Sequence, residues 1–172
     1  LAHLRRLKFM NFVYNNFSGG VPSSWGVLPE LQVLDLGNNG FTGAIPTSIS
    51  NLSKLEYLSL SYNFLQGNIP KYIGNLQNLM TLDMRDNQLT GSLPLTIFNI
   101  SSLQIISISY NGISGTLPTD ICSRLQKLEG LYLSVNELYG QNHRVYMYAQ
   151  SFKLWRWPTT NSVDPYQERL GT

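Results

Sequence analysis

Six asparagines recur along this 172-residue chain at an interval that suits structural hydrogen bonding. They lie 24 residues apart, with a final step of 25, at Asn15, Asn39, Asn63, Asn87, Asn111 and Asn136. A carboxamide has two N–H donors and an acceptor oxygen. At a strand-to-turn corner it can therefore bond inward-pointing backbone groups of its own coil and the next coil, which water cannot reach. The spacing predicts a structural ladder of asparagines, one in each repeat.

A second set of side chains is suited to contacting a peptide or protein. Leu58 and Leu60 alternate with other residues at period two, as do their counterparts in neighbouring repeats, which predicts short strands with one buried face. The intervening residues should point outward and align from coil to coil. The candidates for ligand contact are Tyr57, Ser59, Tyr62, Asp83, Arg85, Asp86, Ser107, Tyr110 and Tyr132.

Three tyrosines, Tyr57, Tyr62 and Tyr110, lead this set because tyrosine buries a large area at a low cost in conformational entropy. Aromatic residues also suit strands without any binding role, so this alternative stays open. Segment 83–86 holds three charged residues in a compact cluster. They either pair with a ligand terminus or satisfy one another in solvent.

Glycine and proline keep the same interval as the asparagines. A glycine follows each asparagine by four residues, at Gly19, Gly43, Gly67, Gly91, Gly115 and Gly140. Five of these glycines precede a proline by three residues, at Pro22, Pro46, Pro70, Pro94 and Pro118. Repeats of this length stack so that each coil covers the leucines of its neighbour, and no repeat is stable alone.

The segments GAIP, GNIP, GSLP and GTLP make residues 1–141 resemble about six plant-specific leucine-rich repeats. The resemblance implies a right-handed solenoid of the α/β repeat class. Its parallel sheet would line the concave face, short 3-10 turns the convex face, and the GxIP segments a second strand-like edge. Segment 120–138 is similar to the 25-residue variant of immune-type receptor kinases, whose extra residue accounts for the longer step.

Such repeats form the ectodomains of plant receptor-like kinases and receptor-like proteins. The resemblance therefore implies recognition of a peptide or protein ligand, with a co-receptor as a further partner, on the extracellular face of the plasma membrane. The membrane would be reached through a segment outside this chain, and so would a serine/threonine kinase, because no kinase motif occurs here. Two alternatives are a secreted, apoplastic inhibitor of a cell-wall-degrading enzyme and a truncated pseudogene product without function.

Composition argues against several other classes of function. Charged residues make up 13% of the chain, the net charge is +2, and no basic run is interleaved with aromatics, which argues against a nucleic-acid partner. His3 and His143 have no carboxylate or cysteine at ligand spacing, so we expect no metal, cofactor or catalytic residue. Cys122, the single cysteine, is expected to be a small buried hydrophobe on the convex side.

Three N-x-S sequons, at Asn16, Asn51 and Asn99, predict N-glycosylation and passage through the secretory pathway. The asparagine and serine of the latter two also belong to the repeat motif, where both residue types suit turns.

Residues 142–172 break the repeat pattern. Back-translated with free wobble bases and read in a shifted frame, they yield another intact repeat. We hypothesise the loss of one nucleotide near codon 142, which would leave a disordered tail. A genuine divergent segment, with Trp155 and Trp157 covering the last coil, is the alternative. An uninterrupted frame for this tail in independent transcripts would contradict the hypothesis.

Overall fold

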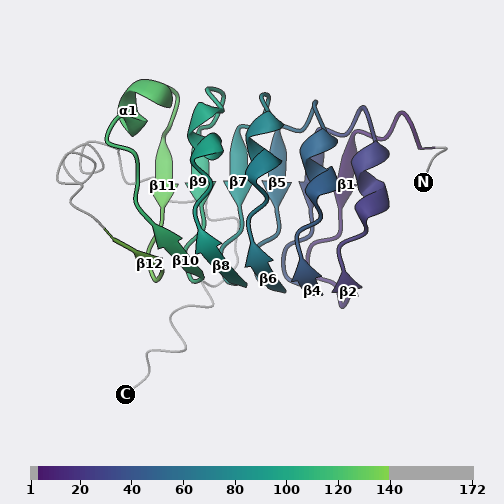
Figure 1. The fold of residues 1–172 in the computed structure, drawn as a ribbon. Coiled ribbons are helices and arrows are strands. Elements are labelled where there is room, and N and C mark those ends of the chain that lie inside the picture. The colour runs from purple at the N-terminus through teal and green to yellow at the C-terminus, as the bar shows by residue number, and fades with distance from the viewer. Residues whose placement is uncertain (1–3, 140–172) are drawn as a thin grey trace, which may run out of the picture.

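Two parallel sheets organise residues 4–139, the part of the chain that the computed structural model describes. Each coil adds one strand to each sheet, and the coils stack in chain order (Figure 1). The first sheet contains β1 (Phe9–Asn11), β3 (Val33–Asp35), β5 (Tyr57–Ser59), β7 (Thr81–Asp83), β9 (Ile105–Ser107) and β11 (Gly130–Tyr132). The second contains β2 (Ser18–Gly20), β4 (Gly40–Ala44), β6 (Phe64–Asn68), β8 (Gln88–Ser92), β10 (Gly112–Gly115) and β12 (Glu137–Leu138). The predicted parallel solenoid with a second strand-like edge is confirmed. The predicted tail, residues 142–172, lies outside the described residues.

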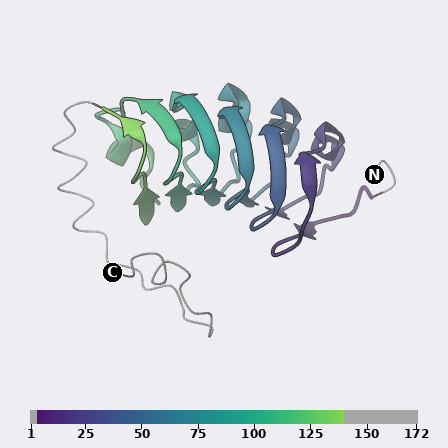
Figure 2. The same cartoon turned by 90° about the horizontal axis from the view of Figure 1, so that it is seen from below.

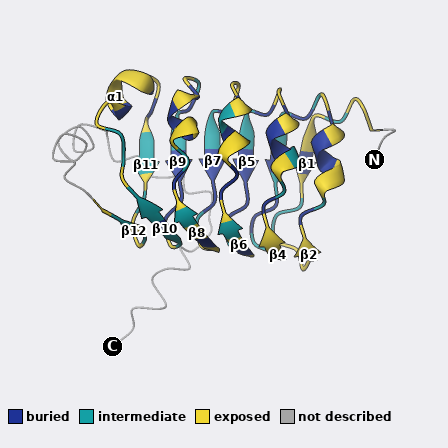
Figure 3. Ribbon diagram, in the orientation of Figure 1, coloured by how far each residue is buried: buried dark blue, intermediate teal, exposed yellow. Residues whose placement is uncertain are grey.

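The register of the first sheet is constant from coil to coil. Leu34 pairs with Leu58, Leu58 with Leu82, and Leu82 with Ile106. All four side chains are fully buried within one continuous apolar core, which runs through the interior of the coils (Figure 3). Burying a leucine contributes about 1.5–3 kcal/mol, and here the cover comes from the adjacent coil.

Short helical turns lie on the side of the coils opposite the first sheet (Figures 1 and 2). The 3-10 helices are η1 (Ser23–Val27), η2 (Thr47–Asn51), η3 (Lys71–Asn75) and η4 (Leu95–Asn99), each directly after a recurring proline. The fifth turn is an α-helix, α1 (Ile121–Arg124). The N–H of Leu125 donates to the carbonyl of Ile121 at 2.9 Å, an i to i−4 bond that encloses one more residue than a 3-10 bond. This wider turn accommodates the extra residue of the 25-residue repeat.

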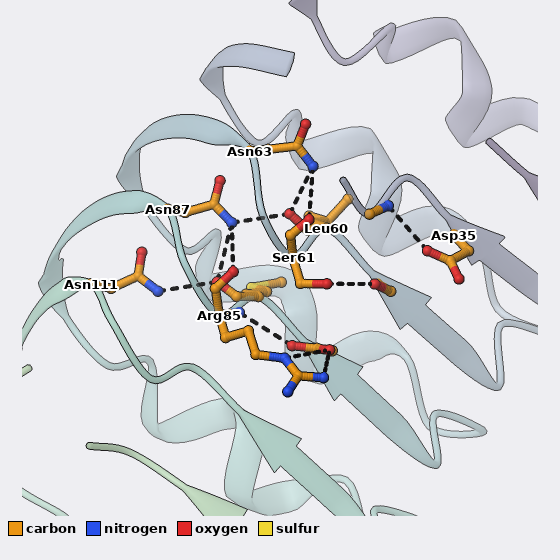
Figure 4. A network of polar contacts seen from close by, with 11 residues as sticks. Asp35, Leu60, Ser61, Asn63, Arg85, Asn87 and Asn111 are labelled. Carbon is orange, nitrogen blue, oxygen red and sulfur yellow. Dashed lines mark hydrogen bonds and ion pairs between the residues drawn. The ribbon is translucent and has the colours of Figure 1, made fainter. Parts of the chain in front are cut away.

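The asparagine ladder is best seen at Asn63, whose side chain is buried (Figure 4). Its Nδ2 donates to the carbonyl of Leu36 in the preceding coil at 3.0 Å. The same amide donates to the carbonyls of Leu60 and Ser61 in its own coil, both at 3.1 Å. Its Oδ1 accepts the N–H of Phe41, again in the preceding coil, at 2.9 Å. One side chain thus satisfies four backbone groups.

The same pattern recurs at Asn39, Asn87, Asn111 and Asn136. Asn15 bonds only two carbonyls of its own coil. The predicted bonds within each asparagine's own coil are confirmed, but the predicted bonds to the next coil were wrong: Asn39, Asn63, Asn87, Asn111 and Asn136 bond the preceding coil. The preceding coil places a backbone carbonyl and a backbone N–H next to the carboxamide, as Leu36 and Phe41 do for Asn63.

The residue before each ladder asparagine has a left-handed backbone, with φ between 53° and 59°. These residues are Tyr14, Asn38, Tyr62, Asp86, Tyr110 and Val135. Asparagine and aspartate adopt this conformation readily, whereas a β-branched residue is strained in it. Cross-coil bonds hold the corner whatever the residue type, as where the N–H of Tyr62 donates to the carbonyl of Arg85 at 2.9 Å.

We predict that Asn63→Ala lowers the free energy of unfolding by about 3 kcal/mol, because several buried backbone groups lose their partner. Equilibrium unfolding in urea, followed by circular dichroism, measures the loss. Asn15→Ala is the matched control, since the exposed carboxamide of Asn15 donates to two carbonyls of its own coil, and it should cost about 1 kcal/mol or less. Equal losses in the two variants would contradict the cross-coil role.

We also predict that Val135→Asn raises the free energy of unfolding by about 1 kcal/mol, because it relieves left-handed strain at a side chain that is 61% exposed. Val27→Asn is the control: this valine is 62% exposed but has no positive φ, so the change should give no gain. A comparable gain in both variants would show that lower surface hydrophobicity, and not strain, is responsible.

Candidate ligand-binding site on the first sheet

The strands of the first sheet and the corners that follow them carry the candidate residues, and their common surface is here called the β1–β11 face. In β1, β3, β5, β7 and β9 the central residue is buried, in β11 it is partly buried, and the residues on either side of it project from the opposite side of the sheet. The register aligns Ser59 with Asp83, Asp83 with Ser107, and Ser107 with Tyr132. Residues far apart in the sequence therefore form continuous columns across the coils.

The candidates differ in how far solvent reaches them. Tyr110 and Tyr132 are exposed, at 41% and 47%, whereas Tyr57 and Tyr62 are partly buried. Asp86 is exposed.

Ser59, Asp83 and Ser107 are buried, with exposed fractions of 3%, 6% and 5%. These three candidates therefore offer little free surface. They are short side chains between larger neighbours, and they form the floor of the face rather than its contact points.

Arg85 lies across the carboxylate of Asp83. Its Nε and Nη2 donate to Asp83 Oδ2 at 3.1 and 2.8 Å, while Asp83 Oδ1 accepts the backbone N–H of Arg85 at 3.2 Å (Figure 4). The guanidinium also lies 5.6 Å from the centre of the Tyr62 ring, within range of a cation–π interaction. This pair therefore satisfies itself, although Asp83 is buried and not solvated.

Hydroxyl groups continue the polar floor on both sides of this pair. The Oγ atoms of Ser59 and Ser61 are 3.1 Å apart, and Ser134 Oγ donates to Ser109 Oγ at 3.1 Å. Asp35 Oδ1 accepts the backbone N–H of Gly37 at 3.0 Å. Sequence reasoning did not select Asp35 or Gly37. The sequence contains a hint of this difference. Segments 34–37 (LDLG) and 82–85 (LDMR) occupy equivalent positions, but the first ends in glycine and the second in the arginine that pairs with its aspartate.

The phenol of Tyr57 has a raised pKa. Burial is the main cause, and the nearby carboxylates of Asp35 and Asp83 add to it, opposed by a hydrogen bond with Ser59 and by the charge of Arg85. Tyr57 therefore remains a neutral hydrogen-bonding group at physiological pH.

The other predicted sites lie away from this face. Asn16, Asn51 and Asn99 are all exposed, and Asn99 Oδ1 accepts a hydrogen bond from Arg124 Nη1 at 3.0 Å. Glycosylation of these three residues remains a prediction. Cys122 is exposed, so the expectation of a buried thiol was wrong: Ile121 takes the buried position of α1, and the next residue of the helix faces away from the core.

No group of three His, Cys, Asp or Glu residues within 4–139 is arranged to hold a metal ion. In the same range, no helix has the length and apolar character needed to cross a bilayer.

The raised pKa of Tyr57 predicts a measurable difference in a spectrophotometric pH titration. Tyr57→Phe should remove one phenol that ionises above pH 10, the ordinary tyrosine value, because burial favours the neutral form. Since the folded pKa exceeds the unfolded one, the stabilisation is complete below pH 10 and is lost as the pH rises through the folded pKa. The same pair of chains unfolded in denaturant is the control, because unfolding removes the burial of Tyr57. A Tyr57 contribution that ionises at the same pH in the folded and the unfolded chain would contradict this environment.

Comparison with known proteins places the repeats in a family. The model of a leucine-rich repeat region matches residues 31–145. Receptor like protein 22 of Arabidopsis thaliana is 47% identical over 53 residues, which is 30% of this chain and 7% of that protein.

Solved structures extend the similarity to the fold of the coils. The TDR receptor gives a TM-score of 0.75 at 39% identity and covers 77% of this chain and 23% of its own. The plant peptide hormone receptor RGFR1, in complex with RGF2, gives a TM-score of 0.77 at 35% identity, and the match covers 80% of this chain and 22% of the RGFR1 chain. The Arabidopsis receptor kinase HAESA, in complex with the peptide hormone IDA and the co-receptor SERK1, gives a TM-score of 0.76 at 30% identity. This match covers 80% of this chain and 23% of the HAESA chain.

This chain spans less than a quarter of each of these four proteins. The similarity nevertheless extends over more than three quarters of this chain in each of the three structures. The chain belongs to the leucine-rich repeat family, and its repeats are of the kind found in the ectodomains of plant receptor-like proteins and receptor kinases.

Proposed function

We propose that this chain is part of the ligand-recognition surface of a plant cell-surface receptor and binds an extended peptide or protein segment across the β1–β11 face. The carrying observation is that Tyr57 and Tyr132 lie on strands of one sheet, with Tyr62 and Tyr110 at the corners that follow two of its strands, beside a floor of short, hydrogen-bonded side chains. Tyrosines of this kind provide area and a hydrogen-bonding tip at little entropic cost.

The floor supports this proposal because it is already ordered before a ligand arrives. Asp83 and Arg85 are fixed by three mutual hydrogen bonds, and Ser59 is hydrogen-bonded to Ser61. A ligand lying on this surface would not need to order these groups, which lowers the entropic cost of binding.

The location and partners of the parent receptor follow from the same proposal. The related ectodomains RGFR1 and HAESA are described in complexes with peptide hormones, and HAESA also with a co-receptor. We infer that this chain acts on the extracellular side of the plasma membrane, takes a peptide or protein ligand, and serves a receptor that pairs with a co-receptor. The exposed sequons at Asn16, Asn51 and Asn99 agree with an extracellular, glycosylated surface.

The tyrosine surface can be tested without a known ligand. Peptides selected on the full chain from a random 12-residue display library should lose at least about tenfold in affinity for the triple variant Tyr57→Ala, Tyr62→Ala, Tyr110→Ala, because removal of anchoring aromatics typically costs more than 1.4 kcal/mol. Titration calorimetry measures the affinity, and thermal unfolding confirms that the variant is folded.

Tyr72→Ala is the matched control, since it removes a tyrosine that is 51% exposed on η3, away from the β1–β11 face. It should leave the affinity unchanged. Selected peptides that bind the triple variant as well as the native chain, or that depend on Tyr72, would overturn the proposed binding face.

A further inference from the structure

Two of the ladder asparagines are followed directly by glycine, at Asn39–Gly40 and Asn111–Gly112, and the dipeptide Asn-Gly occurs nowhere else in the chain. Asparagine is most prone to deamidation before glycine, because glycine has no side chain to hinder its backbone nitrogen and its backbone turns freely. That nitrogen attacks the asparagine Cγ and forms a succinimide ring, while the Cγ–Nδ2 bond breaks and ammonia leaves with the proton of the attacking amide. Water then opens the ring and gives aspartate or isoaspartate. The reaction needs water alone, so these two ladder positions are candidate sites of modification.

In the closed coil the reacting groups of Asn39 and Gly40 are held by other partners. Asn39 Nδ2 donates to three backbone carbonyls at distances between 2.8 and 3.1 Å, and its Oδ1 accepts the N–H of Phe17 at 3.0 Å. The attacking group is engaged as well, because the N–H of Gly40 donates to the carbonyl of Phe17 at 2.7 Å. Attack on Cγ would require the carboxamide to turn away from four hydrogen bonds and the glycine N–H to leave its acceptor. The fold therefore protects this asparagine.

Asn111 is protected by the same set of contacts (Figure 4). Its Nδ2 donates to the carbonyl of Met84 in the preceding coil at 3.0 Å and to two carbonyls of its own coil at 3.1 and 3.3 Å. Its Oδ1 accepts the N–H of Leu89, again in the preceding coil, at 2.9 Å. The carboxamide is therefore released only when the two coils separate at this corner. Repeat proteins open locally in this way, because each coil is held only by its neighbours.

The products of deamidation do not fit the ladder. A carboxylate only accepts hydrogen bonds, so an aspartate in place of Asn111 would face the three carbonyl oxygens to which the amide now donates. Isoaspartate also adds a methylene group to the backbone, immediately before β10 at Gly112 and, in the case of Asn39, before β4 at Gly40. Either product prevents the corner from closing as before. At Asn111 the damage reaches the β1–β11 face, because Tyr110 is the preceding residue of the same corner.

We propose that Asn39 and Asn111 are deamidation sites which the closed coil protects, and that their modification makes the opening of a coil irreversible. The lifetime of the folded repeats is then set by how often these two corners open, because only an open corner reacts and a reacted corner cannot close. Asn63 and Asn87 make the same ladder contacts but are followed by phenylalanine and glutamine, so they do not share this chemistry. The inference concerns the survival of the fold over time and does not depend on the proposed peptide-binding function.

Peptide mapping by mass spectrometry measures the reaction at each asparagine of the full chain, incubated in mildly alkaline buffer with and without guanidinium chloride. In the unfolded chain, Asn39 and Asn111 should deamidate at least about tenfold faster than Asn63 and Asn87, because only the first two precede glycine. Folding should slow both reactions at least about tenfold, which requires an opening free energy of only about 1.4 kcal/mol. Equal rates in the folded and unfolded chain would refute the protection. Equal rates at all four asparagines in the unfolded chain would refute the choice of sites.

Gly112→Ala tests one site while the other serves as the control in the same molecule. The backbone at Gly112 does not have a positive φ, and an added Cβ would meet its nearest neighbour, the carbonyl oxygen of Leu89, at 3.4 Å, so alanine fits. The variant should deamidate at Asn111 at least about tenfold more slowly in the unfolded chain, because the new side chain hinders the attacking nitrogen. The rate at Asn39 should be unchanged. An unchanged rate at Asn111, or an equal fall at Asn39, contradicts the proposal.

Asn111→Asp introduces one product of the reaction directly. Its midpoint of unfolding in urea should fall by at least as much as that of Asn111→Ala, because the carboxylate loses the same donors and faces three carbonyl oxygens. Asn51→Asp is the matched control: this asparagine is exposed on η2, outside the ladder, and the same change in charge should leave the midpoint nearly unchanged. A native midpoint for Asn111→Asp, or an equal loss in the control, would overturn the claim that modification prevents the coil from closing.

Discussion

Each coil ends its strand with backbone N–H and C=O groups that neither sheet pairs, and the ladder asparagine supplies their partners. At Asn63 one carboxamide serves three carbonyls and one N–H, two of these groups in its own coil and two in the preceding coil. Unpaired buried backbone groups are costly, so this position tolerates little else. At the same corner, backbone hydrogen bonds between coils hold the left-handed residue that precedes the asparagine, with φ near 55°. The positions of Tyr62 and Tyr110 on the rim of the face follow from the same constraint.

Much of the fold could be predicted because the repeat ties residue type to backbone position. The strands around Leu58 and Leu82 and their parallel arrangement follow from period and composition, whereas the α-helical turn at 121–124 stands where a 3-10 turn was expected. Contacts that depend on neighbouring coils could not be predicted in the same way. The sequence does not specify whether an asparagine bonds the preceding or the following coil, nor that Cys122 would face outward on a turn whose apolar position is taken by Ile121.

The candidate site also combines features that could be predicted from the sequence with features that could not. Alternation correctly placed Tyr57, Ser59, Asp83 and Ser107 on the outward side of the sheet, but not how deep each would lie. Depth depends on the height of neighbouring side chains, so short residues such as Ser59 and Ser107 become a buried floor. Sequence alone also left open whether Asp83 and Arg85 pair with each other. The structure shows that they do, and that the equivalent Asp35 has no such cation within residues 4–139.

These features describe a hydrogen-bonded sheet surface with tyrosines on it and at its rim. Photocrosslinking tests the central claim, that this surface binds the ligand, most directly. A benzophenone amino acid at position 110 of the full chain, which is 41% exposed, should crosslink to a library-selected peptide, whereas the same residue at position 72, 51% exposed on η3, should not. Crosslinking from position 72 and not from position 110 would contradict the account.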